Sequence, residues 1–499
     1  MSQQVNGLKI QRAAARRAIC TVLGMALALA MVVGQPLAAM AGARSKTPVT
    51  APVADANAKK LIEFGWDVPS VSWLVRNLPS HQDLPFDGFV FTPTNRDRLR
   101  AFEPAPWGKS DINLGQLDRI AWGKYTETFV LLWASGDTVM DWRDNARWAT
   151  VLQNMRLLSK AVSTAGARGV FFDPEFYSNV LHPWSYSAER YPGLSFTDVE
   201  AIVRSRGAEF VQALASAAPD IRILSTYLAS IPASQAGLDR TKLAGTSYAL
   251  LAAFTEGMLE GASERVMLID GQEGPAYGYD ETQKFAEGYR FVKDRVAGFI
   301  DPSVRDRYDS LLRVGEPVFL DMLYGVGRFD RGYPLEYRQA WLQHNVYNAL
   351  LTTDEYAWFY SEQADWWRDW LPQGVRDAVT SARSAFSADQ ALGFDMVKSS
   401  SNYLKSVPAR LVSSPATSLT SETDTSAGPG ATLSFTVTAS QAVRVVLLVD
   451  SREMASSTQG PFAFDLSGLA TGTHVVVARG FTASGDHTSS NPVTVQIAS

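Results

Sequence analysis

Short apolar runs alternate with amphipathic helical patterns along most of the chain. The run from Gly169 to Phe172 has only apolar or tiny side chains, which is typical of a strand buried on both faces. Between Asn145 and Thr164, apolar side chains recur at helical spacing and predict a long helix. Eight such strands are predicted, each followed by a helical or loop segment: Leu61–Phe64, Gly88–Thr92, Thr128–Trp133, Gly169–Phe172, Ile221–Leu224, Val266–Ile269, Val318–Leu320 and Ala357–Tyr360.

Eight strand–helix units within about 320 residues have the count and size of a (β/α)8 TIM barrel. A doubly wound open sheet is the alternative, but the sequence has no glycine-rich dinucleotide fingerprint to favour it. We therefore predict an α/β fold, with a (β/α)8 barrel over residues 59–398.

The pattern changes after the barrel. Apolar side chains then alternate with polar ones in four short runs: Leu433 to Val437, Val443 to Val449, Val475 with Val477, and Val493 to Ile497. Glycine and aspartate turns separate these runs, as in a small all-β sandwich. We predict a linker over residues 399–415 and a β-sandwich over 416–499.

The N-terminus has the pattern of an export signal. A basic stretch precedes an apolar run from Ala18 to Val33 and a small-residue end with a cleavage site at Ala41 or Ala43. This predicts a signal peptide over 1–43, a disordered leader over 44–58, and a secreted or periplasmic bacterial protein without a membrane span in its mature form. A retained anchor is the alternative, although the apolar run is short for a membrane span. The pair Arg16-Arg17 leaves twin-arginine export open beside the general route.

Composition removes several classes of function. The formal net charge of −5 gives no reason to expect a nucleic-acid partner. The only cysteine, Cys20, lies in the predicted signal peptide, and the five histidines are scattered without metal-ligand spacing. No serine-hydrolase elbow or phosphate-binding loop motif occurs. We therefore predict no metal and no cofactor, and the oligomeric state stays unknown.

Carboxylates follow five of the eight predicted strands. The sharpest example is Asp173-Pro-Glu175, because Pro174 ends a strand and leaves both acids just beyond it. In a barrel such residues converge on the face where these enzymes work. The alternative is that Asp173 and Pro174 simply start a helix. The strand-end acids are Asp67, Asp173 with Glu175, Asp270 with Glu273, Asp321, and Glu362.

Aromatic side chains gather at the same predicted strand ends. Flat apolar rings stack on the faces of sugars, and carboxylates bind sugar hydroxyls, so the combination predicts a carbohydrate partner. Any single tryptophan is as readily explained as core filling. The predicted substrate-binding residues are Trp66, Asp67, Trp133, Tyr177, Tyr227, Asp270, Glu273, Asp321, Tyr360 and Trp366.

Residues 60–370 resemble secreted glycoside-hydrolase-type barrels of bacteria, and no specific family is assigned. The segments that carry the resemblance are Ile62–Asp67, Phe86–Gly88, Phe171–Tyr177, Ile269–Glu273 and Asp354–Glu362. The pair Asp173-x-Glu175 is similar to the D-x-E pair after the fourth strand of chitinase-like and lysozyme-like hydrolases. The resemblance implies that Glu175 donates the proton and that Asp173 positions it or a neighbouring group of the substrate. The further upstream acids of chitinase-like chains are replaced by Arg168 and Phe171, which argues against substrate-assisted cleavage. Separately, Gly472–Asp486 resembles bacterial immunoglobulin-like modules appended to secreted enzymes.

The sequence thus predicts an exported glycoside hydrolase. Such hydrolysis needs one protonated carboxyl and one ionised carboxylate. Burial by neighbouring aromatic rings suits Glu175 to be the acid. For the second carboxylate Glu362 ranks first, ahead of Asp270, Glu273 and Asp321. The alternative function is a non-catalytic carbohydrate- or cell-wall-binding protein on a hydrolase-like barrel.

Overall fold

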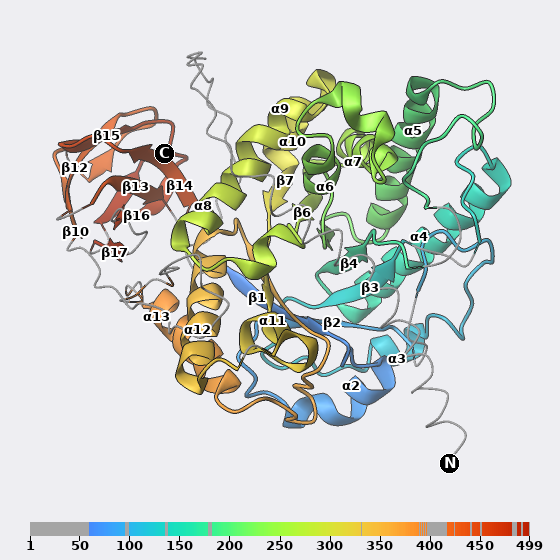
Figure 1. The fold of residues 1–499 in the computed structure, drawn as a ribbon, viewed down its shortest axis with the longest axis horizontal. Coiled ribbons are helices and arrows are strands. Elements are labelled where there is room, and N and C mark those ends of the chain that lie inside the picture. Colours follow the sequence, from blue (N-terminus) through green and yellow to red (C-terminus); the bar gives the residue numbers. More distant parts are fainter. Residues whose placement is uncertain are drawn as a thin grey trace. The chain divides into compact units, whose positions relative to one another are not determined.

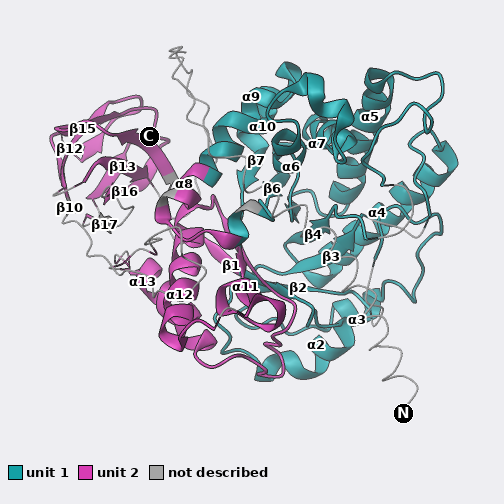
Figure 2. Ribbon diagram, in the orientation of Figure 1, with its two compact units in different colours: residues 1–39, 62–277, 288–317 teal, residues 40–61, 278–287, 318–499 magenta. Residues whose placement is uncertain are grey.

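A computed structural model describes residues 59–94, 99–134, 138–177, 182–330 and 332–388, four single positions from 390 to 396, and 417–498 with short gaps. The predicted signal peptide, leader and linker lie outside these residues. The described chain divides into two compact units, each treated by itself (Figure 2). Unit 1 contains residues 62–277 and 288–317. Unit 2 contains residues 59–61, 278–287 and those from 318 onward.

The barrel strands form one nine-stranded sheet in the order β7-β6-β5-β4-β3-β2-β1-β9-β8 (Figure 1). Neighbouring strands from β1 to β7 run parallel. From β3 to β6 the pairing of residues between neighbouring strands has no register shift. The strands are β1 Lys60–Gly65, β2 Gly88–Phe91, β3 Phe129–Trp133, β4 Gly169–Asp173, β5 Arg222–Ser225, β6 Met267–Asp270, β7 Leu312–Val314, β8 Glu316–Phe319 and β9 Tyr356–Ser361.

The strands at the two ends of this order are consecutive pieces of the chain. Only Gly315 separates β7 from β8, so together they act as the seventh strand of an eight-stranded near-barrel. This confirms the predicted fold class, a TIM barrel followed by a β-sandwich. The predicted seventh strand, Val318–Leu320, was too short, because the buried charged residues Arg313 and Glu316 hide its first half from an apolar pattern.

Helices follow the strands as the helical patterns predict. The long helices of unit 1 are α4 Asn145–Ala165, α5 Phe196–Ala215 and α7 Ala249–Gly261. Unit 2 contributes α11 Leu320–Tyr324, α12 Leu335–Thr352 and α13 Val375–Ser387. The shorter segments are α2 Val71–Asn77, α3 Leu114–Leu117, α6 Ser230–Gln235, α8 Thr282–Arg290, α9 Ala297–Phe299 and α10 Arg305–Leu311, with a π-helix over Phe291–Val296.

Ring packing shows which way the strand residues point. Phe64 on β1 and Phe171 on β4 lie with their ring centroids 4.3 Å apart, although two strands separate them in the sheet. They therefore meet across the barrel interior. Phe172, one residue later, packs instead against Phe210 on α5, at 5.7 Å between centroids. By alternation, Asp173 faces the interior side at the C-terminal end of β4.

Helices α5 and α7 cross with their backbones in contact. Gly207 and Gly257 form the crossing: a Cβ at Gly207 would lie 2.1 Å from the Phe254 carbonyl oxygen, and one at Gly257 would lie 1.8 Å from the Arg204 carbonyl oxygen. No side chain fits either position without moving a backbone. These glycines fix the distance between the two helices that cover β4 to β6.

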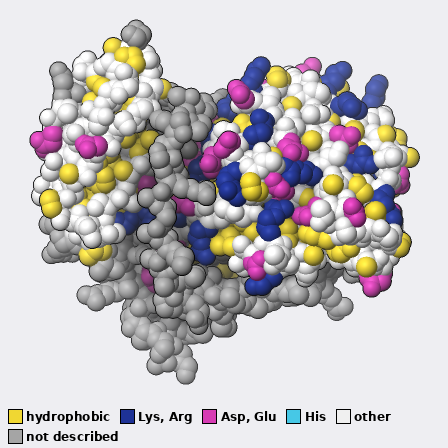
Figure 3. All heavy atoms as spheres, turned by 90° about the horizontal axis from the view of Figure 1, so that it is seen from above, with side chains coloured by type: hydrophobic (Ala, Val, Ile, Leu, Met, Phe, Trp, Pro, Cys, Tyr) yellow, Lys and Arg dark blue, Asp and Glu magenta, His cyan; other side chains and the backbone are white. Residues whose placement is uncertain are grey.

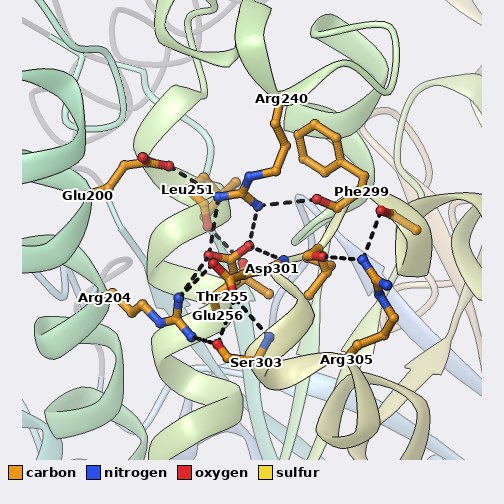
Figure 4. Close-up of polar contacts among 12 residues, drawn as sticks. Glu200, Arg204, Arg240, Leu251, Thr255, Glu256, Phe299, Asp301, Ser303 and Arg305 are labelled. Carbon is orange, nitrogen blue, oxygen red and sulfur yellow. Dashed lines mark hydrogen bonds and ion pairs between the residues drawn. The ribbon is translucent and has the colours of Figure 1, made fainter.

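A network of ion pairs ties the same helices together (Figure 4). Glu256 on α7 is 1% exposed, and Arg240 donates a hydrogen bond to its carboxylate. Arg204 on α5 lies 3.9 Å from the same carboxylate and 3.3 Å from that of Asp301. Burial raises the pKa of nearby Glu200 to about 7. A buried charge is tolerated only when it is paired in this way, so the network has a structural role.

The C-terminal strands of unit 2 form two sheets with a shared apolar core. One sheet has the order β10-β12-β15 and the other β11-β18-β16-β13-β14, with β17 pairing to β16. Leu433, Phe435, Leu447 and Ile497 are among the core side chains. The strands are β10 Thr417–Ser421, β11 Ser426–Ala427, β12 Leu433–Ala439, β13 Arg444–Val449, β14 Arg452–Ser457, β15 Phe462–Leu466, β16 Gly472–Phe481, β17 His487–Ser489 and β18 Val493–Ile497.

Two details of the sandwich differ from the sequence pattern. The β16 side chains in the apolar core are Val476 and Ala478, whereas Val477 lies on the other face. Three valines occur in a row there, so alternation alone does not fix which face is buried. Val443, which the pattern placed in a strand, precedes β13 and is 49% exposed.

The helix crossing generates the first prediction. Gly257→Ala should destabilise the protein by about 1–3 kcal/mol, because the added methyl group meets a backbone carbonyl and forces the helices apart. Gly298→Ala on α9 is the matched control, since a Cβ there has nothing within 4 Å. Thermal or urea unfolding measures both. Equal stability of the two variants would contradict the close crossing.

Candidate functional site

The acids after β4 are held by their own backbone. Asp173 is the last residue of the strand and is 2% exposed. The Glu175 amide donates to the Asp173 Oδ1 atom at 2.9 Å, which turns the chain sharply around Pro174. The next described helix begins only at Phe196, and Ser195 caps it. Asp173 therefore shapes a loop, and the alternative that it starts a helix is wrong.

Tyr177 joins the two carboxyl groups. Its hydroxyl lies 3.1 Å from the Asp173 Oδ2 atom and also within hydrogen-bond distance of the Glu175 Oε2 atom. One hydroxyl has one hydrogen, so it can donate to only one carboxyl at a time. The Tyr177 ring packs on Trp133 with centroids 4.8 Å apart. This ring contact holds the hydroxyl between the two acids.

Trp184 holds the loop after β4 through a buried hydrogen bond. The indole is fully buried and its Nε1 atom donates to the Pro174 carbonyl oxygen at 2.8 Å. Its ring packs against Trp142, Phe102 and Phe254. Trp184 is thus a structural residue that fixes the peptide between Asp173 and Glu175.

Glu273 approaches from the loop after β6. Its amide donates to the Thr226 carbonyl oxygen at 2.9 Å, and the Tyr277 hydroxyl donates to its Oε1 atom at 2.6 Å. Part of the residue is exposed, but the Oε2 atom is buried and has no hydrogen-bond partner of ordinary geometry among the described residues. Burial, together with the charge of Asp173, raises the pKa of Glu273 to about 8.

The carboxyl groups of Glu175 and Glu273 meet. A hydrogen bond between them, with others from Tyr277 and Thr226, acts against the rise of the Glu273 pKa. Two ionised carboxylates are both acceptors, so this contact requires a proton between them. At neutral pH the pair therefore holds one proton.

Two tyrosines stand beside the carboxyl pair. The Tyr227 hydroxyl donates to the Tyr248 hydroxyl at 2.6 Å. Burial raises the pKa of both phenols well above the ordinary value, and the nearby charges of Glu175 and Glu273 add to the effect. The His182 ring packs edge-on against Tyr248, 4.6 Å between centroids, and burial lowers the His182 pKa to about 3. The tyrosines and the histidine are thus neutral at ordinary pH.

Asp270, a predicted substrate-binding residue, is fully buried. It accepts hydrogen bonds from the Ser230 amide at 2.8 Å, the Ser230 hydroxyl at 2.6 Å and the Gln272 amide at 3.2 Å. Burial raises its pKa. These contacts hold the start of α6 and the loop after β6. A contact with substrate at Asp270 stays a prediction.

The acids at the ends of β8 and β9 form a separate cluster within unit 2. Asp321 lies in the first turn of α11, just after β8, and accepts hydrogen bonds from the Ser361 hydroxyl at 2.8 Å and the Glu362 amide at 3.1 Å. Burial raises the Asp321 pKa to about 6. Glu362 pairs with Arg328 at 3.1 Å. Its role as second carboxylate stays a prediction.

The predicted aromatic residues differ in exposure. Trp66, Trp133, Tyr177 and Tyr360 are partly exposed, and so is Asp67, next to Trp66. Trp366 and Tyr227 are buried, at 1% and 4% exposed. Tyr227 still takes part in the site through its hydroxyl, whereas Trp366 packs against Phe359 at 5.6 Å and Arg376 lies over its ring.

Sequence reasoning missed several residues of the site. Thr226 follows the fifth strand and could have been found by the same rule that selected Asp173. Gln272 lies between two predicted site residues in the loop after β6. Tyr248 precedes α7, far along the chain from any strand end, and no pattern in the sequence marks it.

Surface charge, metal-ligand groups and membrane-spanning helices were the other features that could indicate a function. Basic and acidic side chains are intermixed on the face drawn in Figure 3. Within the described residues, no three His, Cys, Asp or Glu side chains are arranged to hold a metal ion. No helix among those residues has the length and apolar character needed to span a membrane.

Comparisons with known proteins give structural similarity without a family. The chain matches no protein-family model and no curated protein. Among solved structures it is similar to a double mutant of the Cellulomonas fimi endo-β-1,4-mannanase, at 11% identity and a TM-score of 0.34, covering 89% of this chain and 95% of the mannanase. It is also similar to Bacteroides uniformis β-glucuronidase 2, at 9% identity and a TM-score of 0.33, covering 86% of this chain. The chain spans only 44% of that glucuronidase.

The C-terminal region has a separate similarity. The fibronectin(III)-like modules of Clostridium thermocellum CbhA match 16% of this chain and 94% of their own length, at 16% identity and a TM-score of 0.15. The similar structures thus include glycoside hydrolases, as the resemblance predicted, and no specific family is assigned. Because all these TM-scores are low, the architecture is taken from the strand order of this chain.

The shared proton generates the second prediction. Glu273 has an ordinary pKa of 4.5 in the unfolded chain and about 8 in the folded protein, so folding takes up a proton between these pH values. Stability should therefore fall as pH rises from 4.5 to about 8, by at most about 1.4 kcal/mol per pH unit. Glu273→Gln should remove this component.

Melting temperatures across this pH range test it, with Glu264→Gln in the exposed turn before β6 as the matched control. The wild type should lose stability relative to Glu273→Gln as the pH rises, and Glu264→Gln should follow the wild type. A difference between wild type and Glu273→Gln that does not change with pH would contradict the assignment.

Proposed function

We propose that the chain is an exported glycoside hydrolase whose acid catalyst is the Glu175–Glu273 carboxyl pair. The observation that carries this proposal is the contact of these two carboxyls at the C-terminal ends of β4 and β6, with a pKa of about 8 at Glu273. A carboxyl that stays protonated at neutral pH can protonate the oxygen of a leaving sugar.

Each neighbouring group has a part in this chemistry. The charge of Asp173 favours the proton on the pair, and its Oδ1 atom holds the Glu175 amide. Tyr177 stabilises whichever of Asp173 and Glu175 is ionised. The proton belongs to the pair and not to one residue, because strongly coupled acids titrate together. Glu175 remains the proposed donor to the substrate, as the D-x-E resemblance implies.

A second carboxylate must attack the sugar or activate a water molecule. Glu362 keeps this assignment as a prediction, and retention or inversion of the sugar stays open. Trp66, Trp133 and Tyr360 are the proposed ring contacts for a sugar, because each is partly exposed. The sugar and linkage are to be found by screening.

The third prediction follows from the acid role. Glu175→Gln and Glu273→Gln should each lower kcat roughly 10²–10⁴-fold on unactivated oligosaccharides, the usual contribution of general acid catalysis. The loss should be much smaller on glycosyl fluorides, whose leaving group needs no protonation. The measurement is product release by the full chain from a panel of polysaccharides, aryl glycosides and glycosyl fluorides.

Glu264→Gln is again the control and should keep wild-type rates. Full activity of Glu175→Gln on oligosaccharides would overturn the proposal. If the wild type binds members of the panel and releases no product from any of them, the chain is a carbohydrate-binding protein instead.

A further inference from the structure

Gln272, immediately before Glu273, has a strained backbone. Its φ angle is +51°, in the left-handed region that side-chain-bearing residues other than Asn and Asp rarely adopt. Such strain persists only where the surroundings enforce it, and it is concentrated at functional sites. Gly274, immediately after Glu273, also has a positive φ, of +95°. The loop after β6 is therefore bent on both sides of Glu273.

Buried hydrogen bonds enforce this conformation. The Gln272 side chain is 4% exposed, and its Nε2 atom donates to the Glu316 Oε1 atom at 2.9 Å and to the Gly315 carbonyl oxygen at 3.3 Å. The Gln272 amide donates to Asp270. Both ends of the residue are thus fixed to the strands on either side of it, β6 and the β7–β8 segment.

Glu316 is an unusual residue for a barrel strand. It is fully buried, and its Oε2 atom has no partner among the described residues. Burial raises the pKa of Glu316 well above its ordinary value and so favours the neutral carboxyl. A neutral carboxyl that accepts from a glutamine amide serves as a hydrogen-bond anchor and not as a charge. Nothing in the proposed chemistry uses Glu316 directly.

We propose that the Gln272–Glu316 hydrogen bond is a positioning clamp that holds Glu273 against Glu175. Gln272 and Glu316 are positioning residues: they touch no substrate, and they act by keeping the Glu273 carboxyl buried at the end of β6. The expected effect of the clamp on catalysis rests on the proposed function. Its expected effect on the pKa of Glu273 does not. Without the clamp the strained loop relaxes, Glu273 becomes solvated, and its pKa falls towards the ordinary value.

The fourth prediction uses a matched pair of substitutions at Glu316. Glu316→Gln keeps an acceptor for Gln272 and is neutral, as the native carboxyl is. Glu316→Leu fills the same space without an acceptor. Because both remove the titration of Glu316 itself, they differ only in the clamp. Gln272→Asn is the third variant: asparagine tolerates the left-handed backbone, but its side chain is one methylene group shorter.

The first readout needs no substrate. Melting temperatures are measured from pH 4.5 to about 8, the interval over which Glu273 binds a proton on folding. In the Glu316→Gln background, adding Glu273→Gln should still remove a pH-dependent loss of stability. In the Glu316→Leu and Gln272→Asn backgrounds, adding it should change nothing further. Equal effects of Glu273→Gln in all three backgrounds would overturn the clamp, since a purely structural role shifts stability alike at every pH.

The second readout is the pH profile of kcat/KM on a substrate found by the screen. Glu316→Leu and Gln272→Asn should lose on the order of 10–100-fold in kcat, the effect of misplacing a catalytic group by about 1 Å. They should also move the alkaline limb to lower pH. Glu316→Gln should keep the wild-type kcat and the wild-type alkaline limb, as should the control Gln116→Asn on α3. If no substrate is turned over, the proposed function fails while the stability readout still decides the clamp.

Discussion

The structure of the site depends on one contact, the hydrogen bond between the carboxyl groups of Glu175 and Glu273. Two carboxylates repel each other, and a buried pair is stable only when it retains a proton. Burial and the negative charge of Asp173 favour that proton, and they outweigh the hydrogen bonds that Glu273 accepts. A carboxyl kept neutral at ordinary pH is what acid-catalysed cleavage of a glycosidic bond requires.

The barrel supplies the rigid parts that hold the pair in place. Asp173 ends β4, and the loop after it is tied to Trp184, whose ring packs against Trp142, shortly before α4, and Phe254 on α7. Glu273 follows β6 and is held through Gln272 by the buried carboxyl of Glu316. The glycine crossing of α5 and α7 keeps these helices at a fixed distance. A site of this kind depends on precise support more than on the number of its polar groups.

Much of the fold was predictable from the sequence, because buried parallel strands consist of short apolar runs that can be recognised along the chain. The exception was the seventh strand, where Arg313 and Glu316 lie within a buried segment and break the pattern. The same rule that finds strands also found Asp173, Glu175 and Glu273, since each follows a strand. It could not find which two of the acids touch, because that depends on loop conformation and on the left-handed backbone of Gln272.

The central claim is that one proton is shared by Glu175 and Glu273 at neutral pH, and infrared difference spectroscopy tests it most directly. Spectra of the full chain are recorded at pH 7 and above pH 9, for the wild type and for Glu273→Gln. The account predicts a component of the protonated-carboxyl band at pH 7 that disappears at the higher pH and that Glu273→Gln lacks, beside the contribution of buried Glu316, which both proteins share. An identical carboxyl band in both proteins at pH 7 would contradict it.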